Sequence, residues 1–62
     1  MTISEYHTTT NNVIDSMHEM ISRIRNNYKA GYLTASEAGK ETERIVDSYS
    51  VVLNNLIVLL DN

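Results

Sequence analysis

The residues whose types and spacing come closest to a chemical site are Asp15, His18 and Glu19, in the pattern Asp-x-x-His-Glu. A carboxylate and an imidazole one helical turn apart have the spacing of metal ligands in helical bundles. Here, however, the helical period directs all three away from the apolar residues of the segment, toward water. The other histidine, His7, lies three turns from His18, too far to share one ion. We therefore predict a solvated polar surface, with no metal site and no cofactor.

Catalytic groups are also missing from the sequence. It contains no cysteine, no glycine-rich loop that would cradle a phosphate and no nucleophile paired with a base. A chain of 62 residues is expected to form a single small domain, and two helices scarcely enclose a pocket. We predict that the protein is not an enzyme.

The five cations form a second candidate site, because all of them lie between residues 23 and 44. In a hairpin they would gather at the turn end, where Tyr28 and Tyr32 could stack on bases. The simpler interpretation is a solvated surface balanced by neighbouring carboxylates, and the net charge of −3 argues against nonspecific nucleic-acid binding. A nucleic-acid-binding hairpin is therefore the alternative function, and its cationic face would consist of Arg23, Arg25, Lys29, Lys40 and Arg44.

The candidate residues described above must be positioned by helices. The stretch 29–38 divides the chain into two helical segments. Gly31 can take the left-handed conformation that closes a helix, and Lys29 suits the negative end of a helix dipole. Thr34 and Glu37 then form a T-x-x-E capping box that begins a second helix. The sequence thus predicts an all-α fold, a two-helix antiparallel hairpin with one helix over about residues 3–30, a turn at 31–34 and a second helix over about residues 35–61.

The start of the first helix has two possible positions. Thr2 and Glu5 form another T-x-x-E box, which favours a start at residue 3. The run of threonine and asparagine at 8–12 opposes helix formation by about 3 kcal/mol in total, so the first turns could fray. Asn12 and Asp15 offer a rival cap. We favour the longer helix because its apolar period continues through residues 3–12.

Both helices carry apolar residues at heptad positions a, d and e, a stripe wide enough for a helical bundle. In the first helix, a holds Ile3, Thr10, Met17 and Ile24, d holds Tyr6, Val13, Met20 and Asn27, and e holds His7, Ile14, Ile21 and Tyr28. In the second, a holds Ala35, Thr42, Tyr49 and Leu56, d holds Ala38, Ile45, Val52 and Leu59, and e holds Gly39, Val46, Leu53 and Leu60. The antiparallel turn brings residues whose numbers sum to roughly 66 to one level, which pairs Ile14 with Val52 and Tyr6 with Leu59.

The second helix carries more apolar side chains than the first helix can cover. Val51, Ile57 and Val58 fall outside the stripe, and leaving them in water would create an adhesive patch. A second chain would cover it, so we expect a homodimer that forms a four-helix bundle, and contact with another protein. The predicted interface consists of Val51, Leu53, Leu56, Ile57, Val58 and Leu60 with Ile14, Met17 and Ile21.

These features favour a small non-enzymatic module for protein–protein interaction, such as a stoichiometric regulator or inhibitor. The richness in asparagine, isoleucine and threonine is compatible with an AT-rich genome of the phage or mobile-element type. A purely structural oligomerisation or assembly module is a further alternative. We expect a cytoplasmic protein, because neither a signal peptide nor a membrane-spanning run is visible. The Gly-x-Leu-Thr-x-x-Glu-Ala turn recurs in many small hairpins, so the sequence by itself assigns no family.

Overall fold

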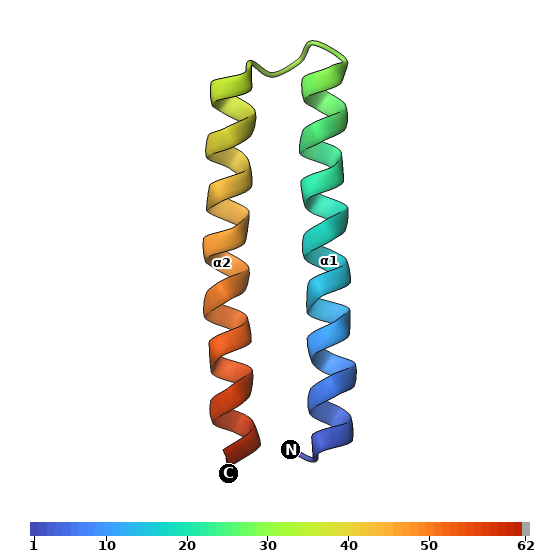
Figure 1. Ribbon diagram of the computed structural model, residues 1–62, viewed down its shortest axis with the longest axis vertical. Coiled ribbons are helices and arrows are strands. Elements are labelled where there is room, and N and C mark those ends of the chain that lie inside the picture. The colour runs from blue at the N-terminus through green and yellow to red at the C-terminus, as the bar shows by residue number, and fades with distance from the viewer. Residues whose placement is uncertain (62) are drawn as a thin grey trace.

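The computed structural model describes residues 1–61 and contains two long antiparallel helices, α1 (Ile3–Lys29) and α2 (Ala35–Asp61). Figure 1 shows them side by side, joined by a short loop, with both ends of the chain at the other end of the hairpin. The described residues include no strand. The predicted all-α helical hairpin is therefore confirmed.

A capping box begins α1 at Ile3. The Glu5 N–H donates to Oγ1 of Thr2 and the Thr2 N–H donates to Oε1 of Glu5, both at 3.1 Å. The amino group of Met1 donates to the backbone carbonyl of Leu59 at 3.3 Å, which ties the start of the chain to α2. The run of threonine and asparagine at 8–12 is helical, so the structure has the earlier of the two possible helix starts.

The turn closes α1 and opens α2 with the two devices that the sequence predicts. Gly31 has a φ of 85°, and its N–H donates to the carbonyl of Tyr28 while the Tyr32 N–H donates to the carbonyl of Asn27. These two bonds form a Schellman motif, which satisfies the last carbonyls of the helix. Thr34 then caps α2 through reciprocal bonds with Glu37, at 3.0 and 3.1 Å.

The seam between the helices is thin. Ile24 and Leu56 are its two buried apolar side chains among the described residues, at 7% and 8% exposure. The rest of the seam is half-buried, and the Thr10 hydroxyl lies buried there without a hydrogen-bond partner. A core this small gives a chain of this length little stability of its own.

The seam departs from the heptad register near the end of α2. The heptad predicts Val52 and Leu59 at d, facing α1, but these side chains are 43% and 49% exposed, whereas Leu53 and Leu60 are half-buried. An α-helix with 3.6 residues per turn drifts by about 20° per heptad relative to a 3.5-residue repeat. After two heptads the drift moves e toward the seam and d out of it. Val52 and Leu59 are for this reason more exposed than the heptad predicts.

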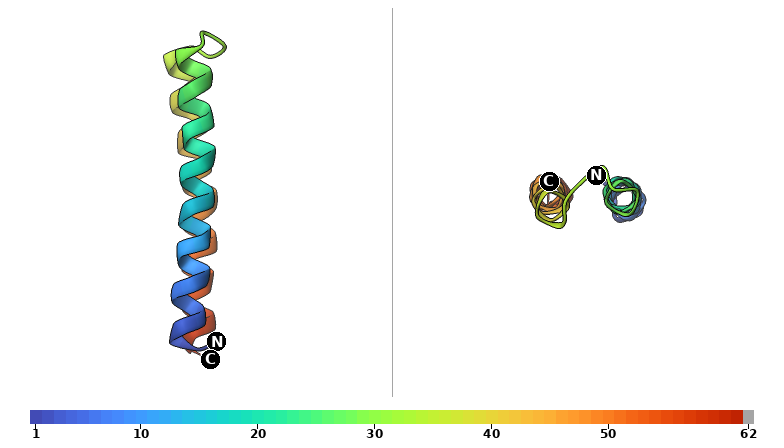
Figure 2. Two further views of the ribbon diagram at one scale, coloured as in Figure 1. Left: turned by 90° about the vertical axis from the view of Figure 1, so that its right-hand side faces the viewer. Right: turned by 90° about the horizontal axis from the view of Figure 1, so that it is seen from above.

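The hairpin is a single layer of two helices. Its Cα atoms span 45 × 16 × 8 Å, and the end-on view in Figure 2 shows nothing above or below the pair. Each helix contacts one neighbour, so both broad sides of the hairpin are open to solvent. Function must therefore be sought on these surfaces.

Candidate interaction surface

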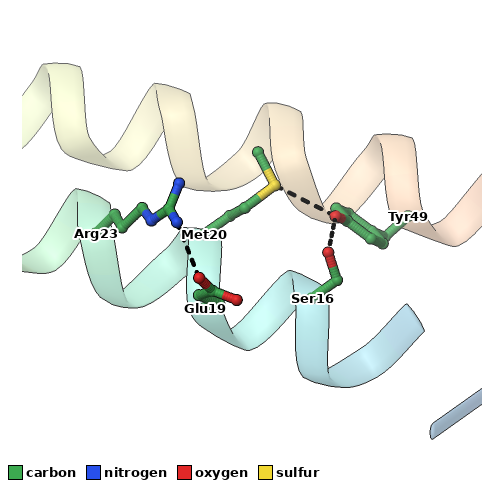
Figure 3. A network of polar contacts seen from close by, with 5 residues as sticks. All are labelled: Ser16, Glu19, Met20, Arg23 and Tyr49. Carbon is green, nitrogen blue, oxygen red and sulfur yellow. Dashed lines mark hydrogen bonds and ion pairs between the residues drawn. The ribbon is translucent and has the colours of Figure 1, made fainter. Parts of the chain in front are cut away.

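One broad side of the hairpin carries a network of polar contacts (Figure 3). Tyr49 reaches from α2 across the seam, where its hydroxyl lies 2.8 Å from the Ser16 hydroxyl and donates to Sδ of Met20 at 3.2 Å. One turn further along α1, Arg23 and Glu19 form an exposed ion pair at 2.9 Å. Ser16, Tyr49, Glu19 and Arg23 thus all have side-chain partners within the chain.

Most of this side, called the back face below, is polar along the seam. In antiparallel helices, the residues just before position a of both helices flank the same side of the seam. These two rows contain hydroxyl, amide and charged side chains: Thr9, Ser16, Arg23, Glu41, Ser48 and Asn55. A surface of this composition is suited to water.

The opposite broad side, called the front face below, is mostly apolar. It is formed by the two e rows of the heptads, which flank a single side of the seam at the start of each helix and turn partly into the seam toward its end. Four of its members, Ile14, Ile21, Leu53 and Leu60, are half-buried against the neighbouring helix and keep an outer surface. Ile57 is exposed at its edge. The front face consists of His7, Ile14, Ile21 and Tyr28 of α1 with Gly39, Val46, Leu53 and Leu60 of α2.

A second apolar surface, called the outer patch below, lies near the carboxyl end of α2. The helical period directs Val51 and Val58 away from α1, and they are 60% and 58% exposed. Val52 and Leu59, turned out of the seam by the register drift, continue this surface toward the back face. Asn55 lies among these side chains, three or four residues from each. An exposed group of apolar side chains of this kind typically marks an interaction site. The outer patch consists of Val51, Val52, Val58 and Leu59.

The structure divides the predicted interface residues into three groups. Ile14, Ile21, Leu53 and Leu60 lie on the front face with Ile57 at its edge, and Val51 and Val58 lie in the outer patch. Met17 and Leu56 belong to the seam, where Leu56 holds the two helices together and offers little surface to a second chain. Sequence reasoning left four accessible residues out of the interface, although the e rows and the helical drift point to them: Tyr28, Val46, Val52 and Leu59.

The predicted cationic face is not gathered into one surface. Arg23 lies on the back face and is paired with Glu19. Arg25, at heptad position b, lies at the front edge of α1, and Lys29, at position f, lies on the outer side of α1. The two remaining cations, Lys40 and Arg44, lie on the outer side of α2, away from α1. The cations surround the turn end without forming a continuous site.

The glutamates of the two capping boxes have a lowered pKa. Hydrogen bonds from the backbone and the side chain of Thr34 hold the pKa of Glu37 below its ordinary value of 4.5. The same contacts with Thr2 lower the pKa of Glu5. Both carboxylates favour helix starts, so their shifts serve the fold and indicate no catalytic group.

Other kinds of site find little support in the part of the chain that the structure describes. No three metal-binding side chains come together among residues 1–61, and Asp15, His18 and Glu19 all face solvent. No pocket is present in this range. Neither helix, over its described residues, has a stretch long and apolar enough to cross a membrane.

Comparison with known proteins adds no relative. No protein family matches the chain, and no curated protein or solved structure proved similar to it. The front face and the outer patch are therefore the basis on which function can be argued.

Proposed function

We propose that this protein is a small non-enzymatic interaction module that acts stoichiometrically, as a regulator or inhibitor, by binding a partner protein through apolar helix surfaces. One observation carries the proposal. The carboxyl-terminal half of α2 has exposed apolar side chains on two separate sides, the front face and the outer patch. A helix that is apolar nearly all round is stable in water only when other chains cover it.

Self-association is the first step of the proposal. The chain exposes 4684 Å². A compact monomer of 7.0 kDa exposes roughly 4,000 Å². The surplus is close to the ~800 Å² that each partner buries in an interface of standard size. Two hairpins packed through their front faces would form a four-helix bundle and remove this surplus from water.

Binding of a different protein is the second step. In a front-to-front dimer, the outer patch of each copy remains on the outside of the bundle. Fully burying a valine or leucine side chain contributes about 1.5–3 kcal/mol, so four such residues can support binding of a partner helix. We expect this to take place in the cytoplasm, in a phage-like or mobile-element setting where small stoichiometric regulators are common.

The first test compares surface variants of equal charge. Light scattering over a hundredfold range of concentration, with far-UV circular dichroism on the same samples, is expected to give a helical dimer. Val51→Asp combined with Val58→Asp should leave the mass and the helicity unchanged, because the outer patch lies outside the dimer. The matched control is Thr8→Asp with Asn12→Asp, at two exposed polar positions of α1 that lie away from the outer patch.

Partner binding is then measured by cross-linking in cells that produce the protein, followed by mass spectrometry. The expected result is a partner that is cross-linked to the wild type and to the Thr8/Asn12 variant but not to the Val51/Val58 variant. If no cross-linked protein depends on Val51 and Val58, the outer patch is not a binding surface. Mobility shifts with nucleic acid at low salt, lost when Arg25 and Lys29 become glutamate, would replace this proposal with the nucleic-acid alternative.

A further inference from the structure

At its turn end the front face has a protruding side chain, Tyr28, beside a gap, which is the open space left by the exposed Gly39. The contact between Tyr49 and Ser16 fixes the register of the helices, so that the e rows meet at four levels about 10.5 Å apart. At the level nearest the turn, Tyr28 is 47% exposed, while a Cβ added to Gly39 would meet no atom within 4 Å. The other levels, toward the open end, pair Ile21 with Val46, Ile14 with Leu53 and His7 with Leu60.

A two-fold axis can join two front faces in two ways. If the axis runs along the helices, both turns lie at one end and α1 of each copy faces α2 of the other. Tyr28 then lies over Gly39 of the second copy, and the protrusion fills the gap. If the axis runs across the helices, the turns lie at opposite ends. Tyr28 then meets His7 of the second copy, and Gly39 faces Leu60.

Charges at the edges of the front face favour the first arrangement. Arg25 lies at the outer edge of α1 and Glu43 at the outer edge of α2, at nearly the same level, and both are exposed. With both turns at one end, Arg25 of each copy lies opposite Glu43 of the other. With the turns at opposite ends, Arg25 faces the uncharged stretch 8–11. Exposed ion pairs add little affinity, but they discriminate between orientations.

We propose that the occupant of the front face is a second copy of this chain, packed with both turns at the same end, so that Tyr28 of each copy fills the space beside Gly39 of the other. This inference rests on the self-association in the proposed function and specifies its geometry. It also leaves the two outer patches at the same end of the bundle, away from the turns, on its outer surface. A partner could therefore engage both patches at once.

The orientation is tested by a distance between two spin labels. Tyr32 is 80% exposed in the loop, so Tyr32→Cys carries a label there without disturbing the helices. With both turns at one end, the two labels in a dimer lie roughly 20 Å apart, because packed helices are about 10 Å from axis to axis. With the turns at opposite ends, their separation approaches the 45 Å length of the hairpin. Ser4→Cys, at the open end, is the matched second reporter and should also give a short distance.

Light scattering on the labelled proteins distinguishes a wrong dimer orientation from an absence of self-association. A dimer with short distances from both labels supports the inference. A dimer with long distances overturns this orientation and leaves self-association standing. A monomer at all concentrations overturns both the dimer and the inference, while the partner-binding test with the Val51/Val58 variant still applies.

Discussion

The hydroxyl oxygens of Tyr49 on α2 and Ser16 on α1 lie 2.8 Å apart near the middle of the hairpin. The Tyr49 hydroxyl also donates to Sδ of Met20, so one side chain of α2 is held by two side chains of α1. The seam has two buried apolar residues among those described and otherwise consists of half-buried ones. These polar contacts therefore fix the antiparallel register where apolar packing alone would tolerate sliding.

Removing the Tyr49 hydroxyl should cost less than removing its ring. Tyr49→Phe loses both hydrogen bonds but keeps the apolar contact, and we expect a loss of about 0.5–1 kcal/mol in the free energy of unfolding. Tyr49→Ala also removes the ring from the seam and should cost about 2–3 kcal/mol. Urea denaturation followed by circular dichroism at one protein concentration measures both. Equal losses in the two variants would mean that the hydroxyl, not the ring, holds the helices together.

The sequence was sufficient to predict the two capping boxes and the left-handed Gly31, because these signals are local. Each depends on residue types at fixed spacing within one turn of chain. The seam was harder to predict, since the facing direction of a residue depends on phase accumulated along the whole helix. The heptad assumes 3.5 residues per turn, slightly fewer than a straight α-helix has. It therefore predicted Val52 and Leu59 in the seam, whereas the structure places them at the surface. The position of a residue far from the turn therefore needed the structure.

The corrected register predicts a large difference between two nearby leucines. Leu56 is buried in the seam, whereas half of Leu59 is in contact with water. Leu56→Ala should reduce the free energy of unfolding by about 2–4 kcal/mol, and Leu59→Ala by less than about 1 kcal/mol. Thermal denaturation at matched concentrations, with the mass of each variant checked by light scattering, distinguishes them. A loss for Leu59→Ala as large as for Leu56→Ala would restore the heptad register.

The capping box of α2 makes stability depend on pH. Thr34→Ala removes the acceptor for the Glu37 N–H and should cost about 1 kcal/mol at pH 7. Because folding lowers the pKa of Glu37, its contribution is present above the ordinary value of 4.5 and is lost as the pH falls through the lower folded value. Denaturation of wild type and Glu37→Gln between pH 7 and pH 3 should therefore converge at acidic pH.

Ser36→Ala is the control for these capping variants. Ser36 lies in the same helical turn, is exposed and takes no part in the capping box. It should leave both the stability at pH 7 and the pH profile close to those of wild type. A stability difference between wild type and Glu37→Gln that persists unchanged at pH 3 would show that the carboxylate contributes through something other than its charge.

The candidate surfaces were only partly accessible to sequence reasoning. The surplus of apolar residues on α2 predicted an interface, and the e rows contained most of the front face. Their division into a front face and an outer patch depends on how both helices are rotated about their axes. Tyr28 illustrates the difficulty, because an aromatic residue in a cationic stretch suggested base stacking. The predicted register already placed it near the level of Gly39, but its exposure and the open space beside Gly39 came from the structure.

Gly39→Ala should have opposite effects on the single hairpin and on the dimer. In the hairpin the added methyl group meets no atom within 4 Å, and alanine favours a helix interior over glycine by about 1 kcal/mol. In the proposed dimer the same methyl group intrudes on the site of Tyr28 from the second copy. Crowding of this kind costs about 1–3 kcal/mol, so the dimer dissociation constant should rise about tenfold or more.

Sedimentation equilibrium gives the dissociation constant of Gly39→Ala, and circular dichroism below that concentration gives the helicity of the monomer. Lys40→Ala is the matched control, because Lys40 adjoins Gly39 but lies on the outer side of α2. It should leave the dimer unchanged. Tyr28→Ala combined with Gly39→Ala should lose less affinity than the two single effects added together, since one contact is involved. If Gly39→Ala dimerises as tightly as wild type, no side chain of a second copy occupies the space beside Gly39.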